Sequence, residues 1–181
     1  MKTELAPRRL DVKAFAKTAG ALAGEDPLAG YARLMAETEG RAASQSLRWA
    51  ARGELRNPGH VNPDIWLHLE ASATLALTCQ RCLGPVDVPV TVSRSYRFVA
   101  DEALAAAQDD DSEEDVLALS PAFDLAELLE DEFLMELPLA PRHEACPEPV
   151  TLAVADPDFE EALARREKPF AQLGKLRTGK G

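Results

Sequence analysis

The chain has 181 residues, of which 46% are hydrophobic and 28% are charged, so its composition is that of a globular protein and not of a disordered one. No apolar run approaches the roughly 20 residues that a membrane-spanning helix needs. The basic residues near the N-terminus have no uninterrupted apolar core behind them, so we expect no secretory signal. Three cysteines are an odd number, which argues against a disulfide framework. We therefore expect a single cytoplasmic domain over residues 1–181.

The formal net charge of −11 is distributed very unevenly along the chain. Residues 1–60 carry ten Lys/Arg against seven Asp/Glu, and residues 61–100 carry three of each. Residues 101–161 hold twenty acids and a single base, whereas residues 162–181 hold six bases and a single acid. The basic ends suit RNA phosphates, and the acidic middle suits a basic protein. The alternative is a solvated acidic surface with flexible basic ends.

The N-terminal part of the chain shows helical spacing of its apolar residues. Two such patterns lie at residues 12–23 and 27–39. Asp26 followed by Pro27 is typical of a helix start, since aspartate caps the first turn and proline is tolerated at its first position. We therefore predict a helical segment over residues 1–44. Residues 45–55 alternate between apolar and polar positions, which predicts a strand.

The clearest periodicity lies between residues 65 and 99. Odd positions from 65 to 77 are apolar, and even positions from 86 to 98 are apolar except at Arg94. A period of two over such lengths predicts two half-buried strands, and the short link between them predicts an antiparallel hairpin over about 65–99. Pro89 lacks a backbone N–H donor, so we expect an edge or a bulge there.

Acidic and helical patterns follow the hairpin. Residues 109–115 contain six acids and one serine, which predicts an acidic loop. Asp124 with Glu127 three residues later is a capping box, and it predicts a helix over about 124–137. The expected architecture is α+β: a mainly antiparallel sheet built around the hairpin, with packed helices. Residues 45–160 form its core, and residues 161–181 form a basic tail.

Four residues with metal-ligating side chains form the strongest chemical signal. Cys79 and Cys82 form a C-x-x-C turn, which places two thiolates on one side of a tight loop, as in half of a tetrahedral zinc site. His143 and Cys146 form an H-x-x-C pair that supplies the other half if folding unites them. We expect one structural zinc ion there. The alternative is a set of reduced cysteines, two at the hairpin tip and one in a distant loop. A redox pair is disfavoured because the motif leads into a strand and not into a helix.

No catalytic constellation emerges from the three histidines or from the acidic runs. Trp49 and Trp66 have the rings to stack on RNA bases, but both lie in strand patterns where packing is the alternative role. The candidate RNA- or partner-binding residues are basic and fall into two groups. The group beside the hairpin is Arg81, Arg94 and Arg97; the group in the tail is Arg165, Arg166, Lys168, Lys175, Arg177 and Lys180.

Three segments in this order carry a resemblance to a known family. They are residues 78–85 around the C-x-x-C turn, residues 124–143 with Cys146 soon after, and residues 168–176. The last is similar to an N-P-F-A-x-L ending, with Lys168 in place of the asparagine. On these segments the chain resembles the YceD family, also described as the large ribosomal RNA subunit accumulation protein.

The resemblance implies a non-enzymatic role in the synthesis, processing or stability of 23S rRNA, and hence in large-subunit biogenesis. It implies large-subunit rRNA, a ribosomal protein or an assembly factor as partner, with no membrane and no small-molecule substrate. It supplies no established active site. In this interpretation the tail contacts rRNA or a ribosomal protein. The alternative is an adaptor whose acidic surface binds a basic nuclease or ribosomal protein, and a third hypothesis is a thiol or zinc enzyme acting on RNA.

Overall fold

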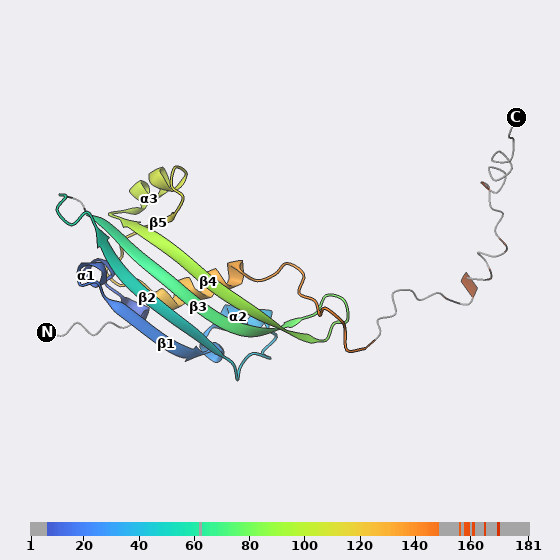
Figure 1. Cartoon of the computed structure of the whole chain (residues 1–181). Coiled ribbons are helices and arrows are strands. Elements are labelled where there is room, and N and C mark those ends of the chain that lie inside the picture. Colours follow the sequence, from blue (N-terminus) through green and yellow to red (C-terminus); the bar gives the residue numbers. More distant parts are fainter. Residues whose placement is uncertain are drawn as a thin grey trace, which may run out of the picture. The chain divides into compact units, whose positions relative to one another are not determined.

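A five-stranded sheet organises the first of two compact units, Met1–Ala145 and Cys146–Gly181 (Figure 1). The computed structural model describes residues 7–61 and 63–148, together with residues 156, 158, 159, 161, 165 and 170. The sheet order is β1-β2-β3-β4-β5, with antiparallel pairs except for the parallel pair β4–β5. The predicted α+β class is confirmed, and the sheet is mixed because of β5. The strands are β1 (Ala21–Pro27), β2 (Ser46–Arg56), β3 (Asp64–Thr78), β4 (Pro85–Val99) and β5 (Asp115–Ala118).

The two longest strands, β3 and β4, lie at the centre of the sheet and carry the sequence's period-two pattern. They pair antiparallel from Ile65 opposite Phe98 to Thr78 opposite Pro85. Pro89 lies opposite Thr74, outside the stretch of β4 that pairs with β5. On the side away from β3, β4 therefore has no paired strand at this point of the described sheet, which is where a proline is tolerated.

The first helical pattern is only half correct. Helix α1 covers Val12–Lys17, and residues 21–23, predicted as helix, belong to β1. The change of direction occurs at Ala19, which has a φ of 47°, and at Gly20, whose N–H donates to the Phe15 carbonyl at 2.9 Å. A Cβ on Gly20 would lie 2.3 Å from the Phe15 ring, so only glycine fits here. This turn lets the chain pair with β2 instead of continuing as helix.

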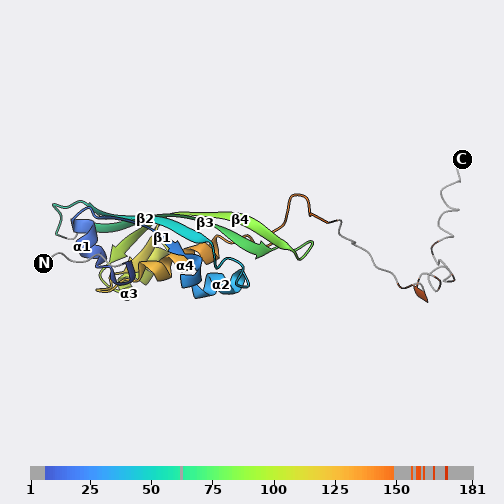
Figure 2. The same ribbon diagram turned by 90° about the horizontal axis from the view of Figure 1, so that it is seen from below.

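Helices cover one face of the sheet. In Figure 2, α1, α2 (Ala32–Glu37) and α4 (Leu125–Met135) lie below the strands and leave the other face of the central strands uncovered. The capping prediction for α4 is confirmed, because the Asp124 carboxylate accepts hydrogen bonds from the N–H groups of Ala126 and Glu127. The core between the helices and the sheet is closely packed. Its largest fully buried side chains include Phe15, Leu69, Tyr96, Leu129 and Phe133.

Helix α2 begins later than the sequence predicts, because Asp26 has another role. The Asp26 carboxylate accepts from the Tyr31 hydroxyl and from the Trp49 indole N–H, both at 2.9 Å. A 3₁₀ turn over Leu28–Gly30 follows, and α2 starts at Ala32. Its first N–H groups are capped from α4: the Glu130 carboxylate accepts from the N–H of Arg33 at 2.7 Å. Glu130 on α4 therefore joins two helices.

The acidic residues 109–115 form a connection between α3 and β5. Helix α3 (Glu102–Asp109) ends in them, and β5 begins at Asp115. The Asp109 carboxylate accepts from the N–H of Val116, and the Ser112 hydroxyl accepts from Arg97. α3 thus forms the crossover that parallel strands require.

The second unit is described at a few residues only. Glu161 and Arg165 form an ion pair at 3.1 Å with helical i,i+4 spacing. The side chains of Phe159 and Phe170 are exposed. Among the helices of the described residues, none combines the length and the hydropathy that a membrane span requires.

Candidate metal centre

The C-x-x-C motif forms a tight turn at the tip of the β3–β4 hairpin. The N–H of Cys79 donates to the Gly84 carbonyl at 2.8 Å, and the N–H of Leu83 donates to the Cys79 carbonyl at 2.9 Å. Leu83 has a φ of 59°, a left-handed conformation that reverses the chain within a few residues. The turn therefore brings the sulfurs of Cys79 and Cys82 to one side of the hairpin.

The pKa of the Cys79 thiol is lowered by its surroundings. Its burial would raise the pKa, but backbone N–H groups of Cys82, Arg81 and His143 donate to its sulfur. Together with the Cys82 side chain they lower the pKa to about 5. Donors that point at a thiolate favour the charged form over the neutral one. The lowered pKa favours the thiolate, the form of cysteine that binds metal ions.

His143 is held with one ring nitrogen turned toward the thiols. Its Nε2 lies 2.9 Å from the Pro85 carbonyl oxygen, and a carbonyl only accepts, so Nε2 carries the proton. Its Nδ1 lies 3.4 Å from the Cys82 sulfur and presents a lone pair there. An imidazole whose other N–H is fixed by a carbonyl is the usual arrangement of a metal-ligating histidine.

Two further contacts join the hairpin tip to the chain that follows α4. The N–H of Gln80 donates to the Pro141 carbonyl at 2.8 Å. The Arg81 guanidinium donates to the carbonyls of His143 at 2.7 Å and Glu144 at 3.2 Å. These bonds explain how residues about sixty positions apart meet. Arg81, predicted to bind RNA, has a positioning role in this cluster.

The four predicted ligands come together. The ligand atoms of Cys79, Cys82, His143 and Cys146 all lie within 4.8 Å of one another. Cys79 is buried and the other three are half-buried. Cys146 directly follows Ala145, the last residue of the first unit. Three sulfurs and one imidazole nitrogen at this spacing could hold a metal ion. Four protein ligands complete a tetrahedral site, so no coordination position is left open for a substrate.

The remaining predicted site residues have other partners or lie outside the described residues. Arg94 donates to Glu136 at 2.7 Å and to the buried Glu132, so it fastens α4 to the sheet. Arg97 donates to Gln108 and Ser112 at 2.8 Å each. Arg165 pairs with Glu161. The tail residues outside the described part of the chain are Arg166, Lys168, Lys175, Arg177 and Lys180.

The two tryptophans have structural roles. Each is 6% exposed; Trp49 donates to Asp26, and Trp66 lies beneath the Arg56 guanidinium, 4.0 Å from its ring centroid. Neither presents a free ring face for a base, so packing is their role.

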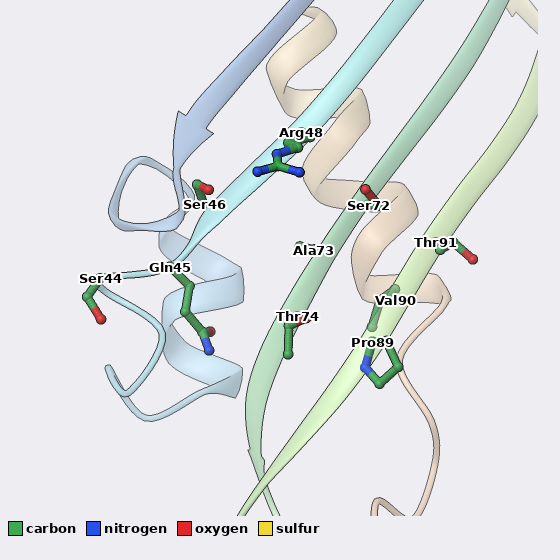
Figure 3. A pocket seen from close by; sticks show the side chains of 10 residues that line it. All are labelled: Ser44, Gln45, Ser46, Arg48, Ser72, Ala73, Thr74, Pro89, Val90 and Thr91. Carbon is green, nitrogen blue, oxygen red and sulfur yellow. The ribbon is translucent and has the colours of Figure 1, made fainter.

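A shallow pocket of about 470 Å³ lies on the uncovered face of the sheet, over β2, β3 and β4 (Figure 3). Hydroxyl side chains such as Ser46, Ser72 and Thr91 line it. Its one charged lining residue is Arg48, which pairs with Glu25 at 3.3 Å. The lining contains no histidine, cysteine or carboxylate, so this pocket lacks the groups needed for acid–base or nucleophilic chemistry.

Sequence reasoning did not identify the residues that position the ligands. The roles of Gln80, Pro85 and Pro141 depend on backbone groups, which have no signature in the side-chain pattern. The one signal that could have indicated the reversal is Gly84, which directly follows Leu83 with its positive φ.

Comparison with known proteins identifies one family. The profile of the YceD family, described as large ribosomal RNA subunit accumulation protein YceD, matches residues 67–177. The matched stretch contains the hairpin from residue 67 onward, α4 and all four residues of the cluster. No curated protein and no solved structure shows significant similarity to the chain.

Proposed function

The chain belongs to the YceD family, and from this premise we propose that it is a non-enzymatic factor that supports 23S rRNA accumulation through its synthesis, processing or stability. In this role it assists large-subunit biogenesis in the cytoplasm. Family membership is the observation that carries the proposal. It applies to more than half of the chain, because the match covers residues 67–177 of 181.

The chemistry of the cluster supports a binding role over a catalytic one. A catalytic zinc site keeps one position open for water or substrate, whereas a structural site is closed by four protein ligands. Cys79, Cys82, His143 and Cys146 make a closed set. In the described part of the chain they are the one group of histidine, cysteine or acidic side chains close enough together to hold a metal ion.

The metal of this proposal is one structural zinc ion. Thiolate and imidazole ligands in a tetrahedral Cys₃His set favour zinc over the hard cations magnesium and calcium. Elemental analysis of protein purified without a histidine tag tests this. We expect about one zinc per chain for the native protein and a loss of zinc for Cys79→Ser with Cys82→Ser. Native protein free of zinc would exclude the metal, and near-complete retention of function by the double variant would exclude a thiol or zinc enzyme.

The basic tail is the proposed contact with rRNA. Its six bases, from Arg165 to Lys180, can neutralise phosphates and release counterions, so binding should weaken as salt rises. We compare the full chain with a chain ending at Glu161 in a salt series with precursor rRNA. The proposed role of the tail requires weaker binding and a shallower salt dependence for the truncated chain. Equal binding by both would exclude it.

The deciding experiment measures the ratio of large- to small-subunit rRNA, with a subunit sedimentation profile, in cells lacking the protein. We expect a selective fall in large-subunit rRNA that the native chain restores. An unchanged ratio during both fast growth and cold stress would refute the proposed function.

The acidic middle of the chain favours a second candidate, an adaptor that binds a basic nuclease or ribosomal protein and affects rRNA indirectly. Residues 101–161 contain twenty acids and one base. The excess of negative charge repels RNA and attracts cations. If the protein is such an adaptor, it should cause no gel shift of RNA. It also requires a protein partner that is lost when the acids of residues 109–115 are neutralised.

A further inference from the structure

A groove lies next to the metal cluster, between the end of α2, the end of β3 and the chain that follows α4. Its volume is about 560 Å³. One wall contains Glu37 and Glu39 at the end of α2, and the floor contains Leu77 and Thr78 of β3. The other wall is the end of α4 and the segment after it. The full lining is Glu37, Glu39, Leu77, Thr78, Gln80, Leu134, Leu137, Pro138, Leu139 and Pro141.

Leucine and proline side chains line part of this groove, and apolar side chains reach solvent beside it. Six of the ten lining residues are leucine or proline. Leu139 is 104% exposed, and the neighbouring Met135 at the end of α4 is 66% exposed. A leucine that is fully exposed in a proline-bounded segment contributes nothing to the core. Apolar residues gathered at the surface in this way mark binding grooves.

The charge of the groove is negative. Its lining has two carboxylates, one of which is offset by Arg41, whose guanidinium donates to Glu39 and to the Thr78 hydroxyl. Glu39 binds Arg41 and the Thr78 hydroxyl, while Glu37 is exposed and has no ion-pair partner among the residues that the structure describes. The carboxylate of Glu37 beside the exposed Leu139 attracts a ligand that is both basic and apolar, and it repels phosphates.

The walls of the groove are fixed before any ligand binds. The N–H of Gln80 holds the Pro141 carbonyl at 2.8 Å, and Arg81 holds the carbonyl of His143. Pro138 and Pro141 restrict the backbone between these points and the end of α4. A preformed groove avoids the entropy cost of ordering its walls on binding.

We propose that this groove binds a short extended segment of a protein, in which leucine-sized side chains are flanked by lysine or arginine. Basic proteins that bind rRNA offer segments of this chemistry. The inference rests on the proposed function, since it names the kind of partner through which that function is exerted. Each leucine-sized side chain lies against the leucines and prolines of the groove, and a flanking cation faces Glu37.

The test uses a fluorescent synthetic peptide with two leucines between flanking lysines, and the full chain. We measure binding by fluorescence anisotropy at low and high salt. Leu139→Ser should weaken binding about tenfold, the change expected when one leucine-sized side chain loses part of its burial. Glu37→Gln should weaken it about two- to threefold at low salt only, because an exposed pair is screened. The matched controls are Val61→Ser and Glu127→Gln, which alter an exposed hydrophobe and an exposed acid elsewhere and should leave binding unchanged.

Leu139 is outside the core, so its variant keeps the fold, and an unchanged thermal unfolding curve verifies this. Equal affinity of the native chain and both groove variants would overturn the proposal. Equal binding of a peptide with glutamates in place of the lysines would also overturn it. If Leu139→Ser abolished binding of an RNA oligomer, the groove would bind RNA and not a protein segment, and the proposal would fall as well.

Complementation separates failure of the groove from failure of the proposed function. If the deletion lowers large-subunit rRNA and the Glu37→Gln, Leu139→Ser double variant restores it fully, the groove proposal falls and the function stands. If the deletion leaves rRNA unchanged, the function falls whatever the peptide does. We expect the double variant to restore the ratio only in part.

Discussion

Removing the metal should loosen the hairpin tip while the sheet stays intact. The N–H groups of Cys82, Arg81 and His143 donate to the Cys79 sulfur, and the N–H of Gln80 donates to Pro141. Of these four bonds, those of His143 and Gln80 join the two halves of the cluster, so they depend on the halves staying together. At free zinc about 100 times its Kd, the bound ion stabilises the closed cluster by about 2.7 kcal/mol. Chelation should therefore speed hydrogen exchange at these amides by about a hundredfold.

The assay is amide hydrogen exchange before and after chelation, with metal loss verified by elemental analysis. Amides in the middle of β3, such as that of Leu69, serve as the internal control, because they belong to the central ladder of the sheet. Unchanged exchange at the tip after complete metal loss would refute the reasoning. Equal acceleration at Leu69 would also refute it, since the metal would then support the whole fold and not the tip.

Three further predictions concern the packing and charge of the first unit. Glu130→Ala removes the cap of α2 and the ion pair with Arg33, so it should lower the free energy of unfolding in urea by about 1–2 kcal/mol. Phe133→Ala empties a fully buried position and should cost about 3–5 kcal/mol in the same assay. Hydrogen bonds lower the pKa of Glu54 from 4.5 to about 2; the bond from Arg56 has the larger effect and the bond from His68 the next largest. The stability that Glu54 contributes is thus complete above about pH 4.5 and lost toward pH 2, so Glu54→Gln should make thermal stability fall less between pH 5 and pH 3.

Each of these predictions has a matched control. Glu127→Ala, at an exposed position of α4, should change the free energy of unfolding by less than about 0.5 kcal/mol, as should other surface changes. Leu104→Ala, at a position 42% exposed, should cost far less than Phe133→Ala. Glu70→Gln, at an exposed position of β3, should leave the change of thermal stability between pH 5 and pH 3 as it is in the native chain. A cost for Glu130→Ala as small as that for Glu127→Ala would show that the cap contributes nothing.

Local patterns in the sequence identified the elements whose neighbours agree with their own preference. The alternation of residues 65–77 and 86–98 predicted β3 and β4, because one face of each strand is buried and the other is not. Asp124 predicted the start of α4, because a cap acts on N–H groups within three residues. Residues 12–23 misled because alanine and leucine fit either period, and the contact of Gly20 with Phe15 ended the helix.

The sequence by itself determined which residues could ligate a metal: the C-x-x-C and H-x-x-C pairs offer three thiols and an imidazole whatever the fold. Only the tertiary structure decided that they meet. Hydrogen bonds between backbone groups about sixty residues apart, such as Gln80 to Pro141, bring them within 4.8 Å. It also decided the role of Arg94, which reads as a basic surface residue but donates to Glu132 and Glu136 on α4. The physical reason is the same in both cases: a side chain's chemistry is local, but its partner is chosen by how strands and helices pack.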